Sequence, residues 1–191
     1  MSVDRSRIEH AVRELLEAIG ESPDRPGLER TPARVADSYA EFFAGIDVDP
    51  LDHLRATLPV EEAGTSEAVI LRDIGFRSVC EHHLLPFVGV AHVAYLPHQR
   101  LIGLSRIPDL IATLSARLQL QERLAENIAD ALEEGLAPRG VLVVLDAVHR
   151  CVAARGSRQS ESSTVTVVSR GVLADPLARA EIMGLIGASR V

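Results

Sequence analysis

The chain has 191 residues, of which 47% are hydrophobic, and this suits one ordinary domain with or without a helical arm. Its formal charge of -7 argues against a nucleic-acid-binding surface, because phosphate backbones require a basic face. The first residues are charged and carry no long apolar run, so we expect no signal peptide, no membrane span and a cytoplasmic location. Two cysteines are too few for a secreted scaffold held by disulfides.

The N-terminal part of the sequence has a helical pattern. Apolar residues recur at helical spacing over about residues 4–20, which predicts an amphipathic helix. Thr31 followed by Pro32 is typical of an N-cap and a first helical residue, so a second helix is predicted from there to about Gly45. We therefore expect residues 1–60 to form an N-terminal helical region.

The remainder, residues 61–191, alternates between β-rich and helical patterns and is expected to be one catalytic domain. The predicted elements are strands at AVILRDI and FVGVAHVAYL, helices between Ile107 and Leu136 with a break at residues 119–121, strands at residues 140–154 and STVTVVS, and a closing helix from about Asp175. This order predicts an α+β fold in which an antiparallel sheet has helices packed on one face.

The two cysteines have histidine neighbours at spacings suited to a metal ion. Cys80 and His83 lie three residues apart, so one turn can present a thiolate and an imidazole together. His149 and Cys151 fall on the long predicted strand, where residues i and i+2 share a face. Three protein ligands leave a position for water, whose pKa zinc lowers to about 7. The spacing predicts a catalytic zinc ion bound by Cys80, His83 and Cys151.

These residues also have simpler interpretations, which stay open at this point. Buried cysteine commonly packs as a small hydrophobic residue, and a disulfide between Cys80 and Cys151 is possible on counting alone. His82 and His149 are well placed for proton transfer beside a metal, because the unperturbed pKa of histidine is close to neutral. Either histidine could instead support a ligand or pack against its neighbours.

Several motifs together carry a resemblance that spans most of the chain. They are Thr31-Pro-x-Arg34, SVCEHHLLPFVG, YLP followed by GLS at Gly103–Ser105, QLQER at Gln119–Arg123, and HRCVAARG at His149–Gly156. In this order they resemble the GTP cyclohydrolase I family, zinc enzymes that convert GTP to dihydroneopterin triphosphate. The resemblance implies the tunnelling fold, an antiparallel sheet backed by helices. It also implies a decamer of two pentamers whose sites lie between subunits.

The resemblance further implies a role for each matching residue. Cys80, His83 and Cys151 would bind one zinc ion per subunit, and His82 and His149 would be the acid and base. Gln121 and Glu122 would bind the guanine edge. The further substrate contacts would be Ser105 and three candidate phosphate ligands, Arg34, Arg106 and Arg155. In the implied reaction water adds at C8 of the purine, formate leaves, and the sugar rearranges and closes onto the freed amines. A solvated surface position is the simpler interpretation for Glu122 and for the arginines.

One position departs from the family pattern. The family follows Gly-Leu-Ser with Lys-x-x-Arg, two cations that help to hold the triphosphate, whereas this chain has Arg106 and Asp109. A carboxylate near phosphates is repelled more strongly in a partly desolvated site than in water. Either another arginine (Arg72, Arg100, Arg158 or one from a second subunit) replaces the missing cation, which we favour, or the chain is a divergent paralogue acting on a less phosphorylated or modified purine. A third interpretation is a non-catalytic purine- or pterin-binding module.

Overall fold

The computed structural model describes residues 3–63, 67–156, 159 and 161–187, and it confirms the predicted order of helices and strands. The first half contains α1 (Arg5–Ala18), α2 (Thr31–Phe42), the 3-10 helix η1 (Pro50–Leu54), β1 (Thr57–Pro59), α3 (Val60–Ala63), β2 (Val69–Cys80) and β3 (Pro86–Leu96). The second half contains β4 (Arg100–Ile102), α4 (Arg106–Ser115), β5 (Leu118–Gln119), α5 (Gln121–Leu136), β6 (Gly140–His149), α6 (Arg150–Ala153), β7 (Thr164–Gly171), the 3-10 helix η2 (Val172–Ala174) and α7 (Pro176–Gly187).

The main sheet has five strands in the order β5-β2-β3-β6-β7. Strands β2, β3, β6 and β7 pair antiparallel, as expected, whereas β5 runs parallel to the last two residues of β2. Strands β1 and β4 form a separate small sheet. Within the described residues, the outer edge of β7 and most of the outer edge of β2 pair with no other strand. The sheet is therefore open at both sides.

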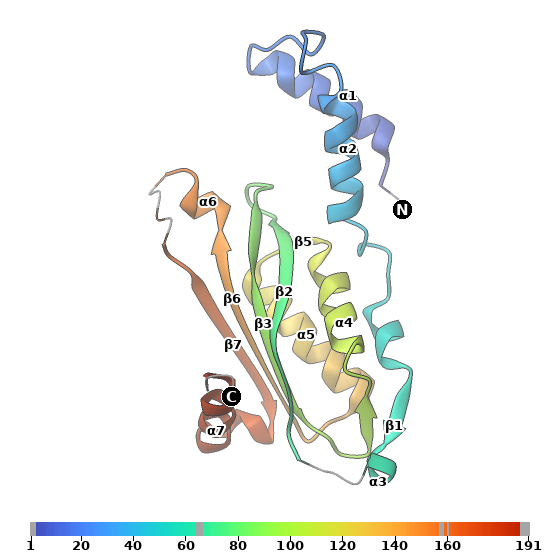
Figure 1. The fold of residues 1–191 in the computed structure, drawn as a ribbon, viewed down its shortest axis with the longest axis vertical. Helices are drawn as coiled ribbons and strands as arrows, with labels where there is room; N and C mark the ends of the chain where they lie inside the picture. The colour runs from blue at the N-terminus through green and yellow to red at the C-terminus, as the bar shows by residue number, and fades with distance from the viewer. Residues whose placement is uncertain (1–2, 64–66, 157–158, 160, 188–191) are drawn as a thin grey trace.

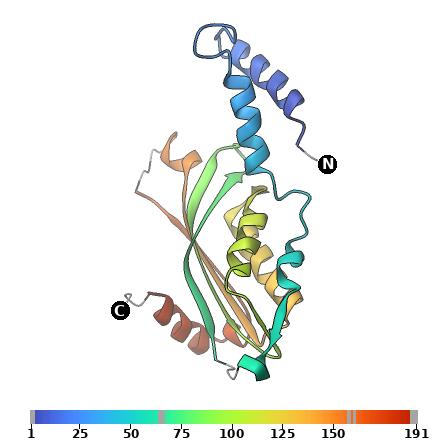
Figure 2. The same ribbon diagram turned by 45° about the vertical axis from the view of Figure 1, so that its right-hand side comes forward.

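The two faces of the sheet bury different sets of side chains. Helices α4 and α5 cover one face, and Val141, Val143 and Leu145 of β6 point into the main core beneath them (Figures 1 and 2). The alternate residues Leu142 and Val144 point the other way, into a smaller core that includes Ile182 of α7. This alternation follows from the two-residue period of a strand. Helices on one face are thus confirmed for α4 and α5, and α7 adds a partial layer on the opposite face.

Helices α1 and α2 pack against each other and project beyond one end of the sheet (Figures 1 and 2). The expected cap of α2 is wrong, because Thr31 is already inside the helix and the N-cap residue is Arg30, which makes no side-chain capping bond. No helix in the described part of the chain has both the length and the apolar character needed to cross a bilayer.

Contacts of α2 and of η1 join the N-terminal region to the sheet region. The guanidinium of Arg77 in β2 pairs with Glu41 and lies over the ring of Phe42, 5.6 Å from its centroid. Further along, Leu54 of η1 is buried in the main core under α4 and α5. Residues before position 60 therefore contribute to the core of the sheet region, and a domain boundary at that position stays a prediction.

Strand β6 is shorter than predicted. It ends at His149, where the predicted strand continued to residue 154, and the chain turns there into the four-residue helix α6. The reason lies in its partner, because β3 begins at Pro86 and its residue Phe87 already pairs with His149. Beyond that pair no partner backbone remains to satisfy a strand. Cys151 consequently lies on a helical turn and not on a strand with His149.

Candidate metal centre

Three segments distant in sequence bring Cys80, His83 and Cys151 to one end of the sheet. Cys80 is the last residue of β2, His83 lies in the turn between β2 and β3, and Cys151 lies in α6 directly after β6. The turn is closed by two backbone hydrogen bonds, Cys80 N to Leu85 O and Leu84 N to Cys80 O, both 2.9 Å. Because β2, β3 and β6 are neighbours in the sheet, the turn and α6 lie side by side.

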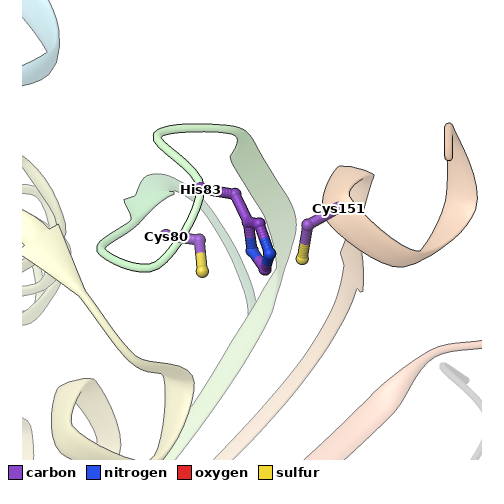
Figure 3. Close-up of side chains that lie close together, drawn as sticks. All are labelled: Cys80, His83 and Cys151. Carbon is purple, nitrogen blue, oxygen red and sulfur yellow. The ribbon is translucent and has the colours of Figure 1, made fainter. Parts of the chain in front are cut away.

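The possible ligand atoms of these three residues all lie within 4.8 Å of one another. The imidazole of His83 lies between the two thiols (Figure 3). Zinc bonds of about 2.0–2.3 Å place ligand atoms roughly 3.5–4 Å apart around a tetrahedral ion, so the observed spacing needs only small side-chain shifts. Two sulfurs and one imidazole nitrogen suit zinc and not magnesium or calcium, which prefer oxygen. The residues present fit the expected metal.

The thiols of Cys80 and Cys151 lie close enough to interact electrostatically. Both cysteines are free, so the structure contains no disulfide between them. Burial raises the pKa of the Cys151 thiol, and the neighbouring Cys80 raises it further, whereas the cation of Arg155 lowers it. Two thiolates side by side repel, and a bound cation removes this repulsion. The cluster is electrostatically suited to hold a positive ion, and Arg155 lies near enough to contribute to its field.

His149 lies beside the cluster but is bonded to another part of the fold. Its Nε2 atom is 2.8 Å from Oε1 of Gln121, and its ring stacks on Phe87 with the centroids 4.7 Å apart and the planes 7° apart. Burial lowers the pKa of His149, and the carboxylate of Glu122 raises it. His82, by contrast, is exposed, and its ring centroid lies 6.2 Å from that of His83. The two expected proton carriers thus have different environments.

Gln121 is almost completely buried, with 1% of its surface exposed. Its amide nitrogen donates to the backbone oxygen of Leu145 in β6 at 3.1 Å and to that of Thr164 in β7 at 2.7 Å. Both amide hydrogens are therefore used inside the protein. Glu122, the next residue, is exposed in the first turn of α5, where free backbone N–H groups and the helix dipole favour a carboxylate or a bound polar group.

An ion pair joins the turn of the metal centre to the start of α5. Arg123 donates to both carboxylate oxygens of Glu81, at 2.6 and 3.1 Å, and Glu81 N donates to Gln119 O at 3.1 Å. The Arg123 guanidinium lowers the pKa of the Glu81 carboxyl. Sequence reasoning did not single out Glu81, Arg123 or Phe87. The opposite charges within the CEHH and QER motifs were a signal for the ion pair, whereas the stacking of Phe87 depends on strand register.

Two of the predicted substrate contacts, Ser105 and Arg106, are not near the metal centre within one chain. Ser105 and Arg106 lie at the start of α4, and a ten-residue helix of about 15 Å separates them from β5, which pairs with Cys80 (Figure 1). The guanidinium of Arg106 lies 3.8 Å from the carboxylate of Asp109. Arg34 is exposed on α2 in the projecting arm. One chain alone therefore brings Arg155 close to the metal ligands, but not Ser105 or Arg106.

The three arginines considered as replacement cations differ in their surroundings. Arg72 donates to the backbone oxygen of Leu185 near the end of α7, at 3.1 Å, where a cation is favoured by the helix dipole. Arg100 is exposed in β4, in the same part of the chain as Ser105. Arg158 lies outside the described residues. Of the two described candidates, Arg100 is the one closer in sequence to Ser105 and Arg106.

Known proteins match the chain along its length. The family model described as GTP cyclohydrolase I matches residues 8–187. GTP cyclohydrolase 1 of Leifsonia xyli subsp. xyli is 62% identical over 184 residues, covering 96% of both chains. GTP cyclohydrolase 1 of Clostridioides difficile is 52% identical over 186 residues, covering 96% of this chain and 97% of that protein. Among solved structures, the dihydroneopterin aldolase of E. coli in complex with neopterin is 14% identical, with a TM-score of 0.43, and covers 55% of this chain and 99% of that one.

Proposed function

We infer the chemistry of the site from one premise, that this chain belongs to the GTP cyclohydrolase I family. It is accordingly a hydrolase with GTP cyclohydrolase activity, as the motifs predicted. The finer reaction is our proposal: hydrolysis at C8 of the guanine ring of GTP, release of formate, rearrangement of the sugar and ring closure to 7,8-dihydroneopterin triphosphate. These steps require proton transfers, and the first of them acts on a purine held beside the metal centre.

We propose that Cys80, His83 and Cys151 hold one zinc ion in each subunit. The proposal is supported by the 4.8 Å limit on their separations and by the sulfur and nitrogen donors, which zinc favours. When bound, zinc supplies a Lewis acid that lowers the pKa of water and so provides a nucleophile near neutral pH. The ligands must be reduced thiols, which agrees with the cytoplasmic location expected from the sequence.

The proton-transfer residues in this proposal are His82 and His149. His149 is supported by its place directly before α6 and by a ring that Phe87 and Gln121 hold in one orientation. His82 is exposed beside His83 and so is accessible to a substrate. Glu122 is proposed to accept hydrogen bonds from the ring N–H and amino groups of guanine, because its carboxylate is exposed and close enough to His149 to affect its pKa.

We propose a homo-oligomer, a decamer of two pentamers, with the sites between subunits. Ser105 and Arg106 lie too far from the metal centre to meet the same nucleotide within one chain, so a second subunit is needed to supply them. In the described part of the chain, the outer edge of β7 and most of that of β2 have no partner strand, so they offer backbone groups for pairing between copies. Strand β7 also exposes Val165 and Val167. Exposed apolar residues on α1, such as Leu15, offer a further contact surface.

The triphosphate is proposed to meet Arg155 beside Cys151, together with Arg34 and Arg106. Asp109 does not exclude this, since its contact with Arg106 is 3.8 Å long and both side chains are about half exposed, at 48%. An ion pair of this kind contributes little stability, so the guanidinium can leave the carboxylate for a phosphate. We therefore favour GTP itself over a less phosphorylated purine.

The observation that carries the proposal is the cluster of Cys80, His83 and Cys151 in a chain of this family. The test is metal analysis of the purified protein, together with turnover of GTP, GDP, GMP and guanosine, followed by released formate and pterin fluorescence. We expect one zinc ion per subunit and GTP as the best substrate. Inert GTP with a reactive guanosine or GMP would identify a divergent paralogue. Absence of both metal and formate would identify a binding module.

A further inference from the structure

Gln121 connects the first turn of α5 with two strands and with His149. Its amide nitrogen faces two backbone oxygens, those of Leu145 and Thr164, and its Oε1 faces His149 Nε2 at 2.8 Å. A backbone oxygen can only accept a hydrogen bond, so the end of the amide that meets two of them must be the NH₂ group. The orientation of the amide is thereby fixed, and its oxygen points at the imidazole.

This orientation determines which nitrogen of His149 carries hydrogen. Because Oε1 can only accept, Nε2 must donate, and the neutral ring then keeps its lone pair on Nδ1. Within the described residues Nδ1 has no hydrogen-bond partner, and stacking on Phe87 holds the ring plane. We propose that Gln121 is a positioning residue, which keeps His149 in the Nε2–H tautomer and presents Nδ1 to the substrate as the proton-accepting atom. This inference rests on the proposed proton transfer by His149.

The same hydrogen bond serves His149 in both of its charge states. When Nδ1 accepts a proton, the ring becomes an imidazolium with hydrogen on both nitrogens, and Nε2 still donates to Gln121. When Nδ1 returns the proton, the starting state is restored without rotation of the ring. The other neutral tautomer would direct the Nε2 lone pair at the lone pairs of Oε1, which is repulsive. Gln121 therefore disfavours the tautomer that cannot accept a proton at Nδ1.

A direct contact of the Gln121 side chain with guanine would be costly. To donate to the base, the amide would have to leave the backbone oxygens of Leu145 and Thr164 without a partner in a buried environment. The exposed carboxylate of Glu122 is available for the base without such a loss. The two adjacent residues thus divide the work, with one holding the histidine and the other meeting the substrate.

The first test measures the tautomer in the unaltered, zinc-loaded protein. The nitrogen chemical shifts of ¹⁵N-labelled histidine, assigned to His149 by comparison with His149→Ala, report which ring nitrogen carries hydrogen. We expect hydrogen on Nε2 and a free lone pair on Nδ1. Hydrogen on Nδ1 with a bare Nε2 would overturn the proposal, and this measurement does not depend on whether any variant of Gln121 folds.

The second test replaces Gln121 by Met, which keeps the size of the side chain and removes its hydrogen bonds. We expect kcat for formate release to fall on the order of 100-fold, the size of a general acid–base contribution, with unchanged zinc content and little change in KM for GTP. The His149 shifts should lose the pure Nε2–H pattern. Gln119→Met is the matched control, because Gln119 is equally buried but its amide bonds Leu114 O and Asn127, away from His149.

The outcomes distinguish this inference from the proposed function. A raised KM for GTP with kcat preserved would show that the amide reads the base, and a fall in kcat with an unchanged His149 tautomer would show that Gln121 only packs. Either result overturns the positioning role. Full turnover by His149→Ala would instead refute the proposed proton transfer by that histidine, whatever the tautomer in the unaltered protein.

Discussion

The two ends of the expected active site are built in different ways. The metal-ligand end uses Cys80 at the end of β2, His83 in the turn after it and Cys151 in α6 directly after β6, so neighbouring strands bring the three together. The expected phosphate end includes Ser105 and Arg106 at the start of α4, which one chain does not bring near the metal centre. The proposed metal ligands are thus positioned by adjacent strands of one chain, whereas our proposal assigns Ser105 and Arg106 to a second subunit. Substitutions at the two ends should therefore have different consequences.

The largest effect is expected at the metal-ligand end, from Cys151→Ala. Two remaining protein ligands bind zinc weakly, so the zinc content should fall to a small fraction of that of the unaltered protein and turnover should disappear. Metal analysis after dialysis measures this directly. Val152→Ala is the matched control, because Val152 is in the same turn and 41% exposed. Full zinc content in Cys151→Ala would remove that residue from the ligand set.

His149→Ala should affect the same end without removing the metal. His149 is bonded to Gln121 and is not among the clustered ligand atoms, so zinc should stay bound while formate release slows by about 10²–10⁴-fold. His92→Ala serves as the control, since its Nδ1 accepts from Asp73 N in the middle of the sheet. A loss of zinc in His149→Ala equal to that in Cys151→Ala would show that His149 is a ligand.

The ion pair between Glu81 and Arg123 should have a smaller effect. Arg123→Met removes the ion pair that holds the turn carrying His83 against α5. Zinc affinity should then fall by about 10-fold or more, as is common when a group that orients a metal ligand is lost. Competition with a chelator measures the zinc affinity. Arg25→Met breaks an exposed ion pair with Glu21 in the arm and should change nothing. If Glu81→Gln and Arg123→Met weaken zinc binding additively, the pair does not act as a unit.

The smallest effect is expected at the phosphate end, from Asp109→Asn. Removing the carboxylate leaves Arg106 free for phosphate, so KM for GTP should fall by about 2–5-fold, as expected for one exposed charge. This decrease in KM should become smaller at high salt, because salt screens the attraction between Arg106 and the phosphates. Guanosine, which has no phosphate, is the control substrate. An equal gain with guanosine would mean that Asp109 acts on the fold or on the base and not on the phosphates.

Sequence reasoning predicted most of the fold because the helical and strand patterns are local. It predicted the break between α4 and α5 and the strands β2 and β3, although β2 continues to Cys80, beyond the AVILRDI segment that was predicted. It overestimated the length of β6, because the end of a strand depends on where its partner begins. Here the partner of His149 is Phe87, which is close to the start of β3. It also did not predict that α7 covers the opposite face of the sheet, since the sequence of α7 does not specify which face it meets.

The candidate site was predictable from local patterns only where its residues lie close together in the sequence. Cys80 and His83 share one turn, so their spacing alone suggested a common metal. The contribution of Cys151 required β6 to lie beside β3, which no local pattern specifies. The bonds from Gln121 to Leu145 and Thr164 depend on the contacts of α5 with two strands. Roles that arise from such long-range contacts become visible only in the folded chain.

The open edges of β2 and β7 have a consequence for how the protein behaves on dilution. If copies pair through these edges, separated subunits expose unpaired backbone and lose the partner that carries Ser105 and Arg106. Stability and activity would then both depend on protein concentration, because association contributes to each by mass action. Dilute samples should lose turnover before they lose zinc, since the three metal ligands belong to one chain, whereas Ser105 and Arg106 would leave with the partner.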